Sequence, residues 1–124
     1  MDGKPKLKTV VLGATDNPGR YAYLAANRLV RHGHPIVPVG RKKGTVAGIP
    51  IRRDFPDDEE IDTITMYLNP RNQEMYYDQI LAASPRRIIF NPGSENPVLK
   101  KQALAKGITV EEACTLVMLS VGNY

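Results

Sequence analysis

The segment from Gly13 to Arg20, GATDNPGR, has the residue types of a phosphate-binding loop. It follows a short β-branched run at residues 9–12 and precedes a segment with helical periodicity. Backbone N–H groups at the start of a helix bind phosphate, and Arg20 in the first turn can pair with a diphosphate. The alternative is that Arg20 is an ordinary surface arginine, because the loop lacks the three glycines of the dinucleotide fingerprint.

A cluster of cations, Arg41, Lys42 and Lys43, comes immediately after Gly40 and an expected strand at residues 35–39. NAD-binding domains usually carry an acidic residue at this place, which holds the ribose hydroxyls. Cations instead fit a phosphorylated ribose, and both NADP, with a 2′-phosphate, and coenzyme A (CoA), with a 3′-phosphate, provide one. The other interpretation is a solvated charge run.

Asn-Pro pairs recur just after expected strands. They occur at residues 17–18, 69–70 and 91–92, and a fourth follows at 96–97. In an open α/β sheet these positions are loops at the carboxyl ends of the strands, where ligands bind. The alternative is that Asn-Pro is simply favourable turn chemistry.

Residues for catalysis or metal binding are scarce. His32 and His34 both follow an expected helix and are expected at the surface. An N-cap role explains Ser94, and Cys114 fits a buried small hydrophobe better than a reactive thiol. No Cys/His spacing indicates a metal site. We therefore assign no catalytic and no metal-binding residue.

The secondary structure needed to position these residues alternates between strands and helices. Strands are expected at residues 9–12, 35–39, 46–51, 61–68, 87–90 and 108–111, and helices at 22–30, 73–83, 96–106 and 116–121. Asp16 or Asn17 is expected to cap the first helix, with Asp16 facing away from the anion, and Gly33 to end it. This order predicts an α/β fold with a doubly wound, mostly parallel sheet of five or six strands and helices on both faces.

Composition sets limits on the function. The chain has 124 residues, which predicts one domain over residues 1–124, with residues 1–7 flexible. Its 17 basic and 13 acidic residues give a net charge of +4, too modest to indicate a nucleic-acid partner. A single cysteine and the lack of a signal-peptide or membrane-spanning run favour a cytoplasmic protein without a membrane partner. A homodimer is a further expectation, because symmetric pairs are the commonest oligomers.

Four blocks of the chain together resemble the small stand-alone CoA-binding proteins, a family similar to the N-terminal domain of the succinyl-CoA synthetase alpha subunit. The blocks read VVLGATDNPGRYAY, PIVPVGRKKGTVAGIP, IDTITMYL and RIIFNPGSENPVLKKQALAKGITVEEAC. The resemblance runs from Thr9 to Cys114. It implies a Rossmann-like fold with strand order 3-2-1-4-5 and CoA lying across the carboxyl ends of the strands.

The resemblance also implies which residues touch the cofactor. Residues 13–15 match the family's Gly-Ala-Ser turn, and residues 38–39 match the start of its Pro-Val-Asn-Pro segment. The chain departs from the family pattern at residues 40–41, 67–68 and 91–93, all in the expected crevice. The candidate cofactor-binding residues are Gly13, Ala14, Thr15, Asn17, Pro18, Arg20, Val39, Gly40, Arg41, Lys42, Lys43, Tyr67, Leu68, Pro70, Asn91, Pro92 and Gly93.

Three functional hypotheses follow. The first is a CoA- or acyl-CoA-binding protein without catalytic apparatus. In this hypothesis the pantetheine arm of the ligand runs along residues 67–70 toward 91–93. The second is an NADP-dependent reductase-like domain, in which the same cations bind the 2′-phosphate. The third is a regulatory or scaffold protein that has lost its ligand. The first two imply a small nucleotide cofactor as the partner.

Overall fold

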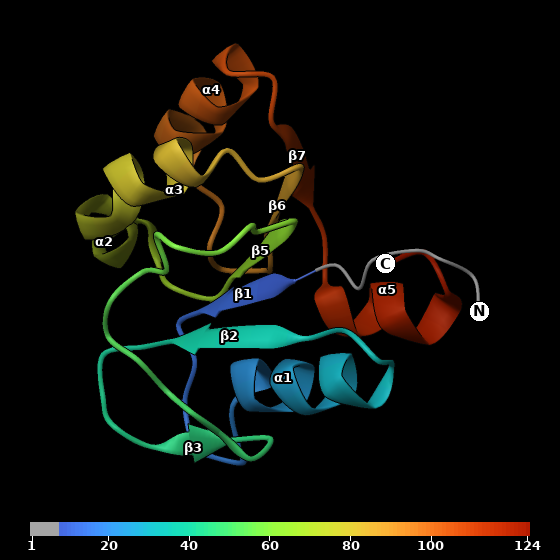
Figure 1. The fold of residues 1–124 in the computed structure, drawn as a ribbon. Coiled ribbons are helices and arrows are strands. Elements are labelled where there is room, and N and C mark those ends of the chain that lie inside the picture. The colour runs from blue at the N-terminus through green and yellow to red at the C-terminus, as the bar shows by residue number, and fades with distance from the viewer. Residues whose placement is uncertain (1–7) are drawn as a thin grey trace.

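The sheet at the centre of the molecule has five parallel strands. The computed structural model describes residues 8–124, so the flexibility expected of residues 1–7 falls outside the described part. The strands are β1 (Thr9–Leu12), β2 (Ile36–Val39), β5 (Thr63–Met66), β6 (Arg87–Phe90) and β7 (Thr109–Glu112), in the order β2-β1-β5-β6-β7 (Figure 1). The predicted Rossmann-like α/β class is confirmed, with five strands.

The strand sequences explain their burial. Every residue of β1, β2, β5 and β6 is buried, whereas β7 at the sheet edge is partly exposed. Short buried runs made mainly of apolar and β-branched residues are typical of parallel strands covered on both faces. Because side chains alternate along a strand, Val10 and Leu12 enter one hydrophobic core and Val11 enters the other.

Helices cover both faces of the sheet. On one face lie α1 (Tyr21–Arg31) and α5 (Thr115–Val121), which lie next to each other despite their separation in sequence. On the other face lie α2 (Pro70–Gln73), α3 (Tyr77–Ala83) and α4 (Pro97–Ala105) (Figure 1). The periodic residues of α1 account for its inner face, since Ala22, Ala25, Ala26 and Leu29 are buried. Gly33, with φ 81°, follows the end of this helix as expected.

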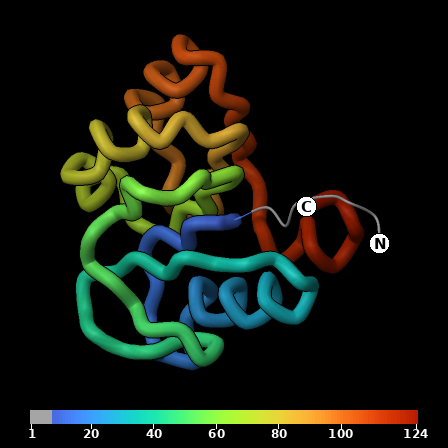
Figure 2. Tube along the Cα trace, viewed as in Figure 1, coloured from blue at the N-terminus to red at the C-terminus, as the bar shows by residue number. Residues whose placement is uncertain are grey.

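The expected strand at 46–51 folds back on itself. It forms an antiparallel hairpin of β3 (Thr45–Val46) and β4 (Ile49–Pro50), which Figure 2 shows apart from the main sheet. Ala47 and Gly48 make the reversal with φ values of 51° and 77°. The place beside β2 that the order 3-2-1-4-5 gives to a third strand holds only a parallel bridge between Val39 and Arg52.

The expected helix at 73–83 is longer and interrupted. It begins at Pro70, because the Asn69 side chain caps it by accepting from the N–H of Asn72 at 2.9 Å. A 3₁₀ turn, η1 (Glu74–Tyr76), then separates α2 from α3. The terminal helix expected at 116–121 is confirmed as α5.

Candidate functional site

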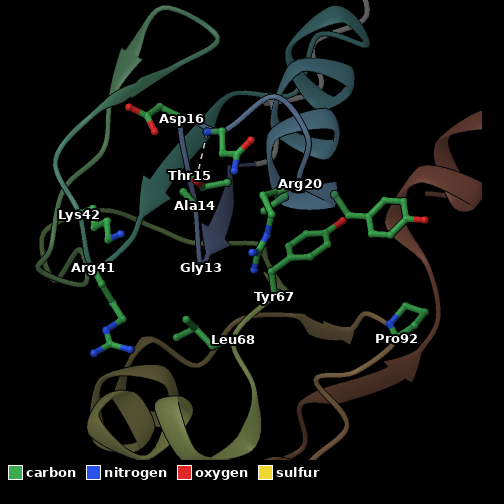
Figure 3. Close-up of a pocket in the computed structure, with 13 residues that line it drawn as sticks. Gly13, Ala14, Thr15, Asp16, Arg20, Arg41, Lys42, Tyr67, Leu68 and Pro92 are labelled. Atoms are coloured by element: carbon green, nitrogen blue, oxygen red, sulfur yellow. Dashed lines mark hydrogen bonds between the residues drawn. The ribbon is translucent and has the colours of Figure 1, made fainter.

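A cavity of about 550 Å³ opens at the carboxyl ends of β1, β2, β5 and β6. Its wall is formed by the loop from β1 to α1, by the first residues of α1 and by the loops after the other three strands (Figure 3). This is the edge of an open α/β sheet at which ligands bind. The lining residues are Gly13, Ala14, Thr15, Asp16, Asn17, Arg20, Tyr21, Ala22, Arg41, Lys42, Tyr67, Leu68 and Pro92.

The loop after β1 is held rigidly against the end of β2. The N–H groups of Gly13 and Ala14 both donate to the Val39 carbonyl, at 2.8 and 2.9 Å. Gly13 has φ 102°, and a Cβ there would lie 3.0 Å from the backbone of Tyr67 and Leu68. Glycine is therefore required at this position for its conformation and for the close approach of the neighbouring strand end.

The start of α1 faces the cavity without a side-chain cap. Arg20 occupies the N-cap position, so the expectation that Asp16 or Asn17 caps this helix is wrong. Asn17 instead accepts from the N–H of Gly19 at 2.9 Å, which closes a turn before the helix. Within residues 8–124, the N–H groups of Tyr21 and Ala22 have no protein acceptor. Unpaired N–H groups at a helix start attract anions.

Asp16 was not expected among the residues that line the cavity. Its carboxylate lies against the backbone of Gly44, where an added Cβ would be 2.7 Å from Oδ2. Asp16 therefore lies on the side of the cavity near the loop after β2 (Figure 3). Tyr21 and Ala22 were also missed. The signal that could have found them was the helix start, since the first residues of a helix share its exposed N–H groups.

The charge of the cavity is mainly positive. Arg20 lies on one side, and Arg41 and Lys42 lie across from it on the loop after β2 (Figure 3). In the part of the chain that the structure describes, no acidic side chain forms an ion pair with any of the three. Lys43, expected in the same cluster, is exposed but does not line the cavity.

Tyr67 and Leu68 form the part of the wall contributed by the end of β5. Burial raises the pKa of the Tyr67 hydroxyl above its usual range, although the nearby hydroxyls of Thr65 and Thr115 act in the opposite direction. This hydroxyl is buried and makes no hydrogen bond of normal geometry among the described residues. Tyr67 is therefore a neutral, apolar surface at neutral pH.

Asn91, expected to bind the cofactor, lies beneath the cavity. Its amide donates to Thr65 Oγ1 at 2.8 Å and to the Met66 carbonyl at 3.0 Å, and its Oδ1 accepts from the N–H of Thr115 at 2.8 Å. Its side chain therefore holds β5, β6 and α5 together. Ser94, expected as an N-cap, instead donates its hydroxyl to the Asn91 carbonyl at 2.7 Å, and Asn96 caps α4.

The structure thus brings only part of the predicted set to the cavity. The predicted residues that line it are Gly13, Ala14, Thr15, Asn17, Arg20, Arg41, Lys42, Tyr67, Leu68 and Pro92. The predicted residues that do not line it are Pro18, Val39, Gly40, Lys43, Pro70, Asn91 and Gly93. Val39 and Asn91 are buried, and both act through hydrogen bonds that shape the wall. A direct contact with the cofactor stays a prediction for every member of the set.

Other groups with possible chemistry lie away from this cavity. Among residues 8–124, no group of His, Cys, Asp and Glu is arranged to hold a metal ion. His34 is half-buried and its ring lies 4.7 Å from that of Tyr124. Burial and the positive charges of His32 and Arg87 lower its pKa. Cys114, expected to be buried, is half-buried at the start of α5.

Comparison with known proteins identifies the family. Residues 8–120 match a protein family described as CoA binding domain. The chain belongs to this family. The match includes every strand of the sheet and every residue that lines the cavity. A search of curated proteins found no significant match.

Solved structures share the fold of this chain. A crystal structure of an uncharacterized protein is 50% identical, with a TM-score of 0.93 over 98% of this chain and 100% of that chain. Cell-free ID.343 from Thermus thermophilus is 22% identical, with a TM-score of 0.84 over 96% of this chain and 91% of the other. A dinucleotide-forming acetyl-coenzyme A synthetase 1 from Ca. Korarchaeum cryptofilum, solved with phosphate and ADP, is 14% identical, with a TM-score of 0.69. The alignment with that synthetase covers 86% of this chain and 25% of the other.

The remaining expectations concern where the protein is located, how its domains are organised and whether it forms an oligomer. Within the described residues, no helix has the length and apolar character to cross a membrane. The cytoplasmic location, the single-domain organisation and the homodimer stay predictions.

Proposed function

We propose that the protein binds coenzyme A or an acyl-CoA in the cavity at the carboxyl edge of the sheet. The observation that carries this proposal is the convergence of unpaired helix N–H groups and cations on one cavity. The N–H groups of Tyr21 and Ala22 face a site shared with Arg20, and Arg41 and Lys42 lie across from them. Membership in the CoA binding domain family supports the choice of ligand.

The diphosphate is assigned to the start of α1. Arg20 can form charge-assisted hydrogen bonds to phosphate oxygens, and the positive end of the helix dipole favours the same anion. Asp16 on the other side of the loop opposes an anion, so the diphosphate belongs on the Arg20 side. This placement leaves Lys42, on the loop after β2, for the nucleoside end of the ligand.

The pantetheine arm is assigned to the wall formed by Tyr67, Leu68 and Pro92. Burial of the Tyr67 hydroxyl leaves a largely apolar surface there, and Leu68 is also buried. In the described lining no Cys, His or Ser side chain is present. The proposal is therefore binding without an assigned chemical step.

A calorimetric titration tests this proposal. We expect CoA and acetyl-CoA to bind with micromolar to millimolar dissociation constants. Replacing Arg20 with Ala should weaken CoA about 5- to 30-fold, because a charge-assisted bond to phosphate is lost. Arg31→Ala, at the opposite end of the same helix, is the matched control and should leave binding unchanged. Absence of heat with both ligands at millimolar concentration would overturn the proposal.

NADP remains a second candidate because the same observation favours it. The loop after β2 carries Arg41 and Lys42 at the place where NAD-binding domains have an acidic residue. A thermal shift screen with CoA, NADP, NAD and ATP separates the candidates. Stabilisation by NADP without stabilisation by CoA favours a reductase-like domain, and no shift with any nucleotide favours the scaffold hypothesis.

A further inference from the structure

A second cavity, of about 450 Å³, lies next to the first. Arg41 lines both, and Figure 3 shows its side chain extending away from Thr15 and Asp16. The other residues that line the second cavity come from the segment after β4 and from η1. They are Arg53, Asp54, Met75 and Tyr76.

Hydrogen bonds fix the position of the Arg53 backbone relative to the first cavity. Its carbonyl accepts a hydrogen bond from the Tyr76 hydroxyl at 3.1 Å, and Tyr76 is itself buried against Phe55. The preceding residue, Arg52, pairs through its backbone with Pro38 and Gly40 at the end of β2, at 3.1 and 2.9 Å. The backbone of Arg53 is therefore fixed beside the end of β2, and Arg53 and Arg41 line the same cavity.

Two neighbouring arginines differ in what they bind within the protein. The Arg52 guanidinium donates to the Asp54 carbonyl at 3.0 Å and lies 3.8 Å from Glu59. Among the described residues, the Arg53 side chain forms no ion pair and no hydrogen bond. The guanidinium of Arg53 is therefore available to a ligand, and that of Arg52 is already engaged.

We infer that the second cavity holds the phosphate carried on the ribose of the bound nucleotide, between the guanidinium groups of Arg41 and Arg53. Two arginines that line one cavity can supply the charge and the donor geometry that a phosphate requires. A ribose phosphate fits better than the diphosphate, because the diphosphate is assigned to the start of α1 in the neighbouring cavity.

The remaining residues of the second cavity agree with this placement. Asp54 opposes an anion, as Asp16 does in the first cavity, so we place the phosphate at the two guanidinium groups and away from this carboxylate. The exposed side chain of Met75 offers an apolar contact to the attached nucleoside. Arg53 and Arg41 also act on the Tyr76 hydroxyl: burial raises its pKa, and both cations oppose that rise. The inference rests on the proposed nucleotide binding, and the ribose phosphate could be the 3′-phosphate of CoA or the 2′-phosphate of NADP.

Paired ligands and paired variants test the inference. Calorimetry would compare CoA with dephospho-CoA, and NADP with NAD, on the unmodified chain, on Arg53→Ala and on the control Arg52→Ala. For whichever pair of ligands binds, we expect Arg53→Ala to weaken binding of the ligand that carries the ribose phosphate about 3- to 15-fold. The dissociation constant of the ligand without the ribose phosphate should change less than about twofold. The control Arg52→Ala should keep the preference for the ligand that carries the ribose phosphate.

Each outcome distinguishes the inference from the proposed function. If CoA binds and Arg53→Ala weakens CoA and dephospho-CoA equally, or weakens neither, the inference is wrong and the proposed function stands. If NADP binds in place of CoA and Arg53→Ala weakens NADP alone, the inference stands and the proposed function is wrong. If the unmodified chain binds neither CoA nor NADP, both are wrong.

Discussion

Gly40 shows how one residue can shape the cavity without lining it. A Cβ at this position would lie 2.3 Å from the Ala14 carbonyl oxygen, well inside van der Waals contact. Only glycine lets the loop after β1 pack this closely on the end of β2. Gly40 was predicted to belong to the cofactor site. That stays a prediction; the structure shows that Gly40 has a packing role, at a position where the resembling family usually has Asn.

Lys42 and Lys43 are neighbours in sequence with different expected roles. Lys42 lines the cavity, and Lys43 does not. We expect Lys42→Ala to weaken CoA about 2- to 5-fold, because one exposed cation beside the nucleoside end of an anionic ligand contributes about 0.5–1 kcal/mol. Lys43→Ala is the matched comparison and should weaken CoA less than Lys42→Ala does, because Lys43 lies outside the cavity lining. Calorimetric titration of both variants measures the difference.

Salt dependence adds a second test of this lysine pair. The effect of Lys42→Ala should shrink as salt rises above about 0.1 M, where charges are screened beyond about 10 Å. Equal effects of the two substitutions would show that the cluster acts through its overall charge and that position within it is unimportant.

Individual residues differ in how far the sequence predicts their place, and the reason is physical. Arg20 was predicted because it adjoins a recognisable strand–loop–helix. Arg53 was missed because its position depends on the hydrogen bond from Tyr76, which is distant in sequence. Asp16 was misassigned because an acidic residue before a helix is usually a cap, whereas here it packs on Gly44. Contacts that depend on tertiary structure leave no local sequence signal.

At the scale of elements, the asparagines of the recurrent Asn-Pro pairs have three different structural roles. Asn69 and Asn96 are N-caps of α2 and α4, each followed by Pro in the first turn. Asn17 closes the turn before α1, and Asn91 joins strands beneath the cavity. Favourable turn and cap chemistry therefore explains most of the recurrence, and of the four asparagines Asn17 alone lines the cavity.

The two Asn N-caps should differ in their contribution to stability. The Asn96 amide also donates to Gln73 Oε1 at 2.9 Å and to the Tyr77 hydroxyl at 2.7 Å, whereas Asn69 is exposed. We expect Asn96→Ala to lower the free energy of unfolding by about 2–3 kcal/mol, since it removes a cap and leaves buried polar groups unpaired. Asn69→Ala should cost about 0.5–1 kcal/mol. Urea denaturation of both variants measures these costs, and equal losses would contradict the role given to the buried amide.

The elements that sequence patterns predicted are those with local causes. The strands β1, β5 and β6 are short buried runs rich in β-branched residues, and α1 has a clear apolar face. The hairpin of β3 and β4 resembles a single strand in the sequence because the reversal depends on Ala47, a residue that rarely has positive φ. The break between α2 and α3 likewise leaves no Gly or Pro in the sequence to mark it.

At the scale of the whole molecule, an ion pair ties β5 to β6 at the edge opposite the cavity. Arg86 donates to both oxygens of Asp62, at 2.8 and 3.1 Å, and the Thr63 hydroxyl donates to the same carboxylate at 2.7 Å. Burial alone acts to raise the pKa of Asp62, but these donors outweigh it and the pKa is lowered. The ionised form is therefore favoured by folding.

This ion pair makes the free energy of unfolding depend on pH, and the lowered pKa of Asp62 sets the direction. A carboxyl group whose pKa is lowered by folding stabilises the protein above its unfolded pKa, and this stabilisation is lost as the pH falls through the folded value. We expect Asp62→Asn to lower the free energy of unfolding by about 1–2 kcal/mol at pH 7. The difference from the unmodified chain should shrink below about pH 4 and vanish in stronger acid.

Asp57 is an exposed residue in an acidic run at residues 57–60, and it provides the control for this pH dependence. It forms no hydrogen bond or ion pair among the described residues, so Asp57→Asn should change stability by less than about 0.5 kcal/mol at every pH. Thermal unfolding between about pH 3 and pH 8 measures both variants. If the stability difference between Asp62→Asn and the unmodified chain were constant across that range, the ion pair would not be the source of the stabilisation.

The attachment of two amides to one carbonyl has a consequence for amide hydrogen exchange. The N–H groups of Gly13 and Ala14 are tied to Val39, so they should exchange as slowly as the sheet does, with or without ligand. The N–H groups of Tyr21 and Ala22 have no acceptor within the described chain and should exchange quickly until an anion binds them. Residue-resolved exchange measured by NMR would therefore separate a loop start that is protected at all times from a helix start whose protection reports occupancy.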